Sequence, residues 1–268
     1  MAVEHIERAD DPRVAGYRGL RDGELARARG LFVAEGRIVV RRILEDGRYR
    51  VQSVLVNEAA RRDLESTFAN MAADVTIFVS HAKELAEIAG FDMHRGCVAL
   101  VERPAGMPVD DLIASARLLV VLEAVANADN VGGVFRNAAA FGAGGVLLSP
   151  GCCDPLYRKA IRTSMGAVLG VPFARAAGAD WPGVLTRVRA AGFTIAALTP
   201  RGPSETLEIF AARPRPDRVA LIVGTEGAGL TAAVEAAADN RVRIPIAGGV
   251  DSLNLAVATG IALHAIRS

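Results

Sequence analysis

The sequence predicts an α/β protein in two parts, the second built on a parallel sheet. The second part contains five strongly apolar runs, at residues 118–122, 145–149, 193–198, 219–223 and 241–246. Strands that are apolar along their whole length are typical of a parallel sheet that is buried on both faces. Helical stretches separate these runs, and such alternation of strand and helix is the pattern of an α/β fold.

Residues 1–105 repeat this alternation on a smaller scale. The apolar runs lie at 31–34, 51–56, 74–79 and 96–101, and the helical stretches lie near 36–45, 58–69 and 81–89. The segment 102–108 combines two prolines with a glycine, which is typical of a linker. We therefore expect a small α/β domain at residues 1–105 and a larger domain at residues 106–268.

The helices expected in the larger domain lie near 131–141, 156–168, 181–191, 230–238 and 252–266. Asn130 stands where an N-cap belongs in the first of them, and Ser252 is placed to cap the last, with Asp251 near the positive end of that helix. The last helix is apolar on most sides and needs cover. That cover is either deep burial within one chain or a second copy of the chain.

Composition excludes several classes of protein. No apolar run reaches the roughly 18 residues that a membrane span needs, and the N-terminus lacks the apolar core of a signal peptide, so we expect a cytoplasmic protein. The three cysteines form no C-x-x-C pair and the four histidines show no ligand spacing, so we expect neither a metal nor a disulfide.

The net charge of +1 argues against wholesale electrostatic capture of nucleic acid. The segment from Arg8 to Arg50, however, holds 11 arginines against 7 acidic residues. Arginine suits phosphate because its planar fork donates two hydrogen bonds at once. The chain has only two lysines, so arginine is alternatively its default cation, and contact with RNA or DNA stays open on this feature alone.

Three polar segments follow apolar runs and together indicate a site. Arg136 lies among small residues soon after the run 118–122, where packing explains an arginine poorly. Glu226 lies in a glycine-rich loop after the run 219–223, and the alternative without a functional role is an exposed turn with a solvated carboxylate. Asn254 is a poor helix former inside an apolar run, and capping by its neighbours leaves it unexplained.

Two familiar nucleotide-binding patterns fail here. The first segment lacks the G-x-G-x-x-G of a dinucleotide site and the acidic residue that should follow about twenty positions later. The loop at 224–231 has the glycine spacing of a P-loop, but Leu230 stands where a lysine must reach the phosphates. The sequence therefore disfavours both an NAD enzyme and a P-loop ATPase.

The three segments together resemble the SpoU/TrmH-type RNA ribose methyltransferases of the SPOUT superfamily. The matching residues are Asn130-Val131-Gly132 through Arg136, Gly224-Thr225-Glu226-Gly227 with Gly229-Leu230, Ile244-Pro245 with Ser252-Leu253-Asn254, and Asp154-Pro155 through Arg162, Ser164, Met165 and Gly166. The resemblance runs from about residue 106 to the C-terminus. It departs from the family at Ala128-Asp129, where a proline is frequent.

The resemblance implies a trefoil-knotted parallel-sheet domain, an exception to ordinary chain topology. It also implies S-adenosylmethionine as cofactor, a homodimer that completes each active site, and a small RNA-binding domain at residues 1–105. The residues expected to contact the cofactor are Leu198, Thr199, Gly224, Ile244 and Leu253. Glycine at 224 and 227 is interpreted as room for a ligand against the main chain.

The expected reaction is methyl transfer to a ribose 2′-hydroxyl of rRNA or tRNA, with rRNA favoured and no metal required. The expected catalytic residues are Arg136, Asn130, Glu226, Ser252 and Asn254. A guanidinium rarely loses its proton, so we expect Arg136 to hold the substrate phosphate and the developing alkoxide. The alternatives are an RNA-binding protein without activity on the same scaffold, and a SPOUT methyltransferase that acts on a base.

Overall fold

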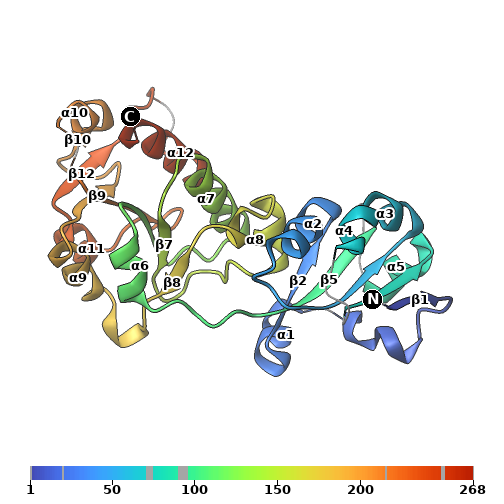
Figure 1. The fold of residues 1–268 in the computed structure, drawn as a ribbon. Helices are drawn as coiled ribbons and strands as arrows, with labels where there is room; N and C mark the ends of the chain where they lie inside the picture. Colours follow the sequence, from blue (N-terminus) through green and yellow to red (C-terminus); the bar gives the residue numbers. More distant parts are fainter. Residues whose placement is uncertain are drawn as a thin grey trace. The chain divides into compact units, whose positions relative to one another are not determined.

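The computed structural model describes residues 2–19, 21–70, 75–89, 96–214, 216–248 and 251–267. The chain forms two compact units (Figure 1). Unit 1 comprises Met1–Ala105 and Leu156–Gly166, and unit 2 comprises Gly106–Pro155 and Ala167–Ser268.

Unit 1 contains a mixed five-stranded sheet in the order β1-β4-β3-β5-β2. Its strands are β1 (Ala2–Ile6), β2 (Leu31–Glu35), β3 (Val51–Val56), β4 (Thr76–Ser80) and β5 (Cys97–Glu102). Its helices are η1 (Pro12–Tyr17), α1 (Asp22–Arg29), α2 (Arg37–Asp46), α3 (Glu58–Asp63), α4 (Glu65–Ala69), α5 (Ala82–Ala89) and α8 (Arg158–Thr163). The strands β1, β4 and β3 run parallel, whereas β5 is antiparallel to both β3 and β2.

The sequence analysis did not predict β1, η1 or α1. Strand β1 is mostly exposed and therefore carries little apolar signal. The expected helix over 58–69 divides at Leu64 into α3 and α4. Asp74, the first residue of the expected run 74–79, lies outside the described residues. The four expected apolar runs otherwise correspond to β2, β3, β4 and β5.

The segment Leu156–Gly166 belongs to unit 1, whereas the sequence assigned it to the larger domain. Its helix α8 packs on β2 through the buried residues Ala160 and Ile161. The expected helix over 156–168 is therefore shorter. It ends at Thr163, and Met165 and Gly166 then take positive φ angles of 53° and 76°.

Unit 2 is built on a seven-stranded sheet in the order β10-β12-β9-β11-β6-β7-β8, and every pairing in it is parallel. The strands are β6 (Leu118–Glu123), β7 (Gly145–Leu148), β8 (Phe173–Arg175), β9 (Thr194–Leu198), β10 (Glu205–Thr206), β11 (Val219–Gly224) and β12 (Asn240–Arg243). The predicted parallel sheet is thus confirmed. The short strands β8 and β10 were not predicted.

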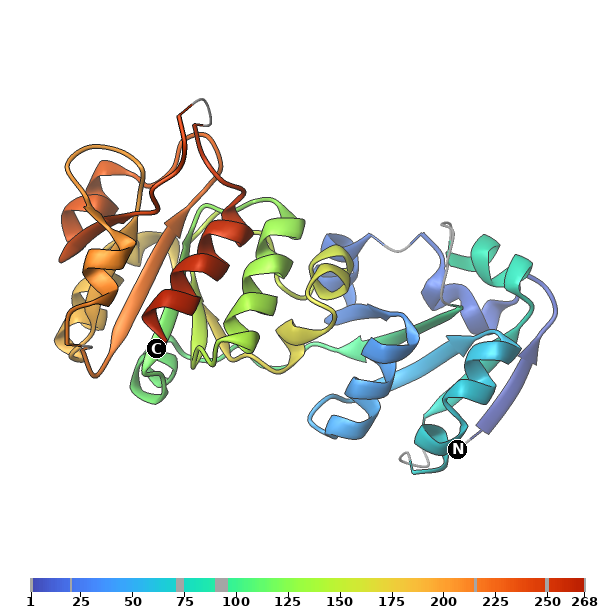
Figure 2. The same ribbon diagram turned by 90° about the horizontal axis from the view of Figure 1, so that it is seen from above.

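Helices cover both faces of this sheet (Figures 1 and 2). The elements are α6 (Val109–Ser115), α7 (Ala128–Ala140), η2 (Ala167–Leu169), η3 (Gly178–Asp180), α9 (Val184–Ala190), α10 (Leu207–Ala211), α11 (Ala232–Ala237) and α12 (Leu255–Ile266). On one face, α6, α9 and α11 share a core with the strands through Ile113, Val188 and Val234. On the other face, α7 and α12 lie side by side. No helix within the described ranges is long and apolar enough to cross a membrane.

The close contact between α7 and α12 depends on small residues. A Cβ added to Gly133 would lie 2.5 Å from the Cβ atom of Ala256. The Asn137 side-chain amide also donates to the Ala256 carbonyl at 2.6 Å. A larger residue at position 133 would therefore push the start of α12 away from α7.

Both helices begin at residues other than those expected. The N-cap of α7 is Asn127, whose side chain accepts from the Asp129 N–H at 2.8 Å. The N-cap interpretation of Asn130 is therefore wrong, and Asn130 lies buried in the first turn. The N-cap of α12 is Asn254, so neither Asp251 nor Ser252 caps that helix.

Arg218 ties three elements of unit 2 together at the start of β11. Its guanidinium donates to the carbonyls of Ala191 and Ala116, each at 2.7 Å, and lies 4.2 Å from the Phe193 ring centroid. It also donates to the Ile113 carbonyl. These acceptors lie at the carboxyl ends of α6 and α9, where a cation is favourable.

We predict that Arg218→Ala lowers the free energy of unfolding by about 3 kcal/mol, because several carbonyls lose a charged donor together. Urea denaturation measures this loss. The matched control is Arg117→Ala, since Arg117 is exposed and its side chain makes no hydrogen bond or ion pair with the described residues. A change in Arg218→Ala no larger than in this control would contradict the role of Arg218.

Candidate active site

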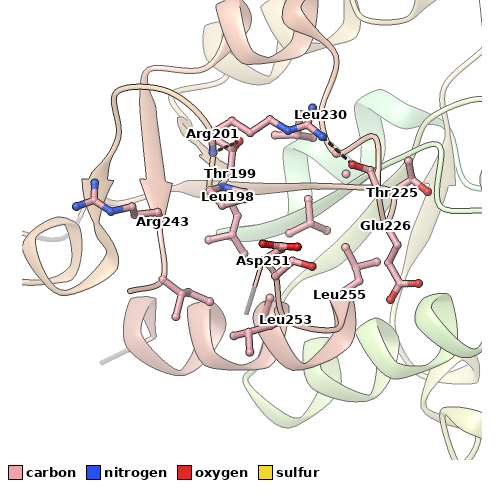
Figure 3. A pocket seen from close by; sticks show the side chains of 18 of the residues that line it. Leu198, Thr199, Arg201, Thr225, Glu226, Leu230, Arg243, Asp251, Leu253 and Leu255 are labelled. Carbon is pink, nitrogen blue, oxygen red and sulfur yellow. Dashed lines mark hydrogen bonds between the residues drawn. The ribbon is translucent and has the colours of Figure 1, made fainter. Parts of the chain in front are cut away.

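A cavity of about 490 Å³ opens at the carboxyl ends of three neighbouring strands of unit 2 (Figure 3). Its walls come from the loops that follow β9 and β11, at residues 198–201 and 224–230, from Ile244, Ile246 and residues 251–253 after β12, and from the start of α12. The carboxyl edge of a parallel sheet is where α/β proteins bind their ligands. The volume is that of a site for a drug-sized or cofactor-sized molecule.

The five residues expected to contact a cofactor all line this cavity. They come from all three loops: Leu198, Thr199, Gly224, Ile244 and Leu253. Further apolar wall is supplied by Val223, Leu230 and Leu255. A cavity of apolar side chains interrupted by main-chain groups suits a flat ring whose polar edge is read by peptide N–H and C=O groups.

The glycines of the loop after β11 serve the loop itself. A Cβ added to Gly224 would lie 2.4 Å from the Gly229 carbonyl carbon, so only glycine fits there. Gly227 has a φ of 79° and no atom within 4 Å of an added Cβ. Close loop packing accounts for Gly224 and a left-handed backbone accounts for Gly227, while the interpretation of these glycines as room for a ligand stays a prediction.

One side-chain amide joins all three of the polar segments that the sequence singled out. The Asn254 Nδ2 donates to the Asn130 Oδ1 at 3.0 Å and to the Glu226 Oε1 at 3.1 Å. The Asn254 Oδ1 accepts from the N–H groups of Ala256 and Val257 at 3.0 and 3.2 Å. All four hydrogen-bonding positions of the amide are used, which fixes its orientation.

The remaining expected catalytic residues differ in their surroundings. Ser252 lines the cavity, as does Glu226. Arg136 lies exposed on α7 and does not line the cavity, and its side chain makes no hydrogen bond or ion pair with the residues that the structure describes. Its charge is therefore available to a ligand. The structure thus joins Asn130, Asn254 and Glu226 directly, and leaves Arg136 outside that cluster.

Sequence reasoning missed two arginines of the cavity. Arg201 reaches from the loop after β9 to the loop after β11, where its Nη2 donates to the Gly227 carbonyl at 2.7 Å (Figure 3). Arg243 is the last residue of β12 and donates to the Ser204 carbonyl. Arg201 follows the carboxyl end of the expected strand 193–198, and that position is the signal that could have identified it. Arg243 lies inside the expected run 241–246, so the sequence carried no such signal for it.

No group of three or more histidine, cysteine, aspartate or glutamate side chains among the described residues could hold a metal ion. The polar groups of the site are instead two amides, hydroxyls, carboxylates and arginines, all gathered at one edge of the sheet. Fold and site define the class as an α/β protein that binds a cofactor-sized ligand beside a cluster of polar side chains.

The chain belongs to the SpoU rRNA Methylase family, whose model matches residues 117–264. It is therefore an RNA methyltransferase of this family. This finding confirms the resemblance that the three polar segments carry.

Similar proteins match over almost the whole chain. A protein of Mycobacterium bovis, described as an uncharacterized tRNA/rRNA methyltransferase, is 38% identical over 98% of this chain and 91% of its own. The 23S rRNA (guanosine(2553)-2′-O)-methyltransferase of Bacillus subtilis is 25% identical over 99% of this chain and 100% of its own. The AdoMet-bound rRNA methyltransferase of Sinorhizobium meliloti has a TM-score of 0.83 at 28% identity, covering 99% of this chain and 97% of that one.

We predict that Asn254→Ser separates the two roles of Asn254. Serine caps a helix about as well as asparagine, so the free energy of unfolding should fall by no more than about 1 kcal/mol. Methyl transfer to RNA should fall at least about tenfold, because the link from Glu226 to Asn130 is lost. Urea denaturation and a methyl-transfer assay measure the two effects.

The control for this variant is Asn127→Ser, which makes the same exchange at the N-cap of α7. Asn127 makes no side-chain hydrogen bond to Glu226, Asn130 or Asn254 among the contacts of the described residues. Equal activity in the two serine variants would show that the Asn254 network has no catalytic role.

Proposed function

We propose that this chain transfers a methyl group from S-adenosylmethionine to a ribose 2′-hydroxyl of RNA, with rRNA favoured over tRNA. The observation that carries the proposal is the Asn254 amide. It joins Asn130 and Glu226 at the rim of the cavity that the five expected cofactor residues line. The name of the Bacillus subtilis relative supports a ribose target.

The cavity fits S-adenosylmethionine by volume and by chemistry. Its apolar walls suit an adenine ring, and the main chain at Gly224, Ile244 and Leu253 offers donors and acceptors for the ring and the ribose of the cofactor. Leu198 and Thr199 would close the side formed by β9. When bound, the cofactor supplies a methyl group on a positively charged sulfur.

The residues around the cavity would orient the RNA. A ribose hydroxyl is a weak acid, so the site must align its oxygen with the methyl carbon and stabilise the charge that develops on that oxygen. Glu226 has one carboxylate oxygen held by Asn254, and that hydrogen bond fixes where the carboxylate meets the ribose. The Ser252 hydroxyl in the cavity lining would hold the same sugar.

Arg136 would supply positive charge rather than accept a proton. A guanidinium keeps its proton in proteins and donates two hydrogen bonds in one plane, which suits a phosphate. No described acidic side chain neutralises Arg136. We therefore assign it to the substrate phosphate and to the developing alkoxide.

We also propose that the chain acts as a homodimer with a knotted C-terminal domain, and that residues 1–105 recognise RNA. Val257 and Ile261, one turn apart on α12, are 52% and 41% exposed. A second copy would remove this apolar surface from water. The arginine-rich segment from Arg8 to Arg50 supports RNA contact by unit 1.

We predict that Arg136→Ala lowers methyl transfer at least about 100-fold, because the developing charge loses its cation. Affinity for S-adenosylmethionine should stay within a few-fold, since Arg136 does not line the cavity. A methyl-transfer assay and calorimetry measure the two quantities. Arg136→Lys keeps the charge but lacks the planar guanidinium, so its rate of methyl transfer should lie between those of the wild type and Arg136→Ala.

Lost cofactor binding, or full turnover, in Arg136→Ala would contradict this assignment. Mass analysis of the nucleosides from the product RNA tests the target atom at the same time. The proposal requires the added methyl group on the sugar fragment. A methyl group on the base would indicate a base-directed enzyme, and RNA binding without any methylation would indicate a binding protein.

A further inference from the structure

Glu123 is a buried carboxylate that the proposed reaction does not use. It is the last residue of β6 and is 3% exposed. Within the described part of the chain it forms no ion pair. A carboxylate in this position is costly unless hydrogen-bond donors replace water. Packing alone therefore does not explain a carboxylate at this position.

The donors to Glu123 come chiefly from Thr231. The Thr231 N–H donates to Oε2 at 2.9 Å, and the Thr231 hydroxyl donates to Oε1 at 2.8 Å. The indole N–H of Trp181 adds a longer contact of 3.4 Å to Oε1. Both carboxylate oxygens are thus engaged, and one residue receives most of the interaction.

Thr231 directly follows the cavity-lining loop of residues 224–230. The other end of that loop is also beside Glu123, because Glu123 pairs with Gly224 in the β6–β11 register. One residue of β6 therefore contacts both ends of the loop: its backbone lies beside the first residue, and its carboxylate holds the residue after the last.

The loop has further contacts of its own, since Gly224 packs against Gly229 and Glu226 accepts from the Asn254 amide at 3.1 Å. Its internal bonds run from Gly229 N to Thr225 O at 2.9 Å and from Ala228 N to Glu226 O at 3.1 Å. Its middle, residues 226–228, is exposed, and there Arg201 holds the Gly227 carbonyl from an exposed position. At the base of the loop, Leu230 is buried in the hydrophobic core, and Glu123 is the buried polar group that holds Thr231.

We propose that Glu123 is a positioning residue for S-adenosylmethionine, acting through Thr231. By holding the base of the loop, it keeps the Gly224 main chain and the Glu226 carboxylate in place before the cofactor arrives. Ordering a loop on binding costs affinity, and an anchored loop avoids that cost. The inference rests on the proposed function only for the location of the cofactor.

The test is calorimetry of S-adenosylmethionine binding to the full-length chain, with Glu123→Gln and Glu123→Ala compared with the wild type. Glutamine can still accept from the Thr231 N–H and donate to its hydroxyl, so its dissociation constant should rise about threefold. Alanine leaves both Thr231 donors without an acceptor, so its dissociation constant should rise at least about tenfold. At saturating cofactor, the kcat of Glu123→Gln should stay within about twofold of wild type while KM for the cofactor rises.

Arg218→Ala is the matched control, because it destabilises unit 2 at the opposite end of β11 from the loop. It should bind S-adenosylmethionine within about twofold of wild type. If Glu123→Ala does not fold, Glu123→Gln and Thr231→Val decide the question, the second removing only the hydroxyl donor and its cap. Each should weaken binding more than the control does.

Two results would overturn the proposal. One is wild-type affinity in the Glu123 and Thr231 variants. The other is equal loss of affinity in Arg218→Ala, which would mean that general destabilisation explains the effect. A wild-type chain that binds the cofactor but does not methylate RNA would contradict the proposed function, and the binding test of Glu123 would still apply.

Discussion

The side-chain amide of Asn254 is the interaction on which the site of unit 2 depends. Its oxygen starts helix α12, and its nitrogen reaches both Asn130 on α7 and Glu226 on the loop after β11. The same side chain therefore begins helix α12 and links the polar residues of the site. The geometry requires α12 to lie close against α7, and Gly133 allows this because any side chain there would meet Ala256.

The sheet supplies the second constraint. Since all strands of unit 2 are parallel, their carboxyl ends share one edge, and loops that are distant in the sequence meet there. The cavity takes its walls from the loops after β9, β11 and β12, while Asn130 comes from the helix after β6. Short-range chain geometry holds each loop, as the packing of Gly224 against Gly229 shows.

Much of this arrangement was predictable because it rests on strong local patterns. Uniformly apolar strands predicted the parallel sheet, and the family resemblance implied the residues that line the cavity. The errors arose where tertiary contacts override local signals. Asn127 caps α7 although Asn130 fits the pattern equally well, and the partners of Leu156–Gly166 lie in unit 1, far away in the sequence. The role of Glu123 depends on the distant residue Thr231, which no local pattern reveals.

The structure of the chain with S-adenosylmethionine bound is the measurement that tests this account most directly. The account predicts that the cofactor lies in the cavity, against the main chain of Gly224, Ile244 and Leu253, while the Asn254 amide still joins Asn130 to Glu226. A cofactor bound elsewhere on the chain, or an Asn254 side chain turned away from Glu226 in the complex, would contradict it.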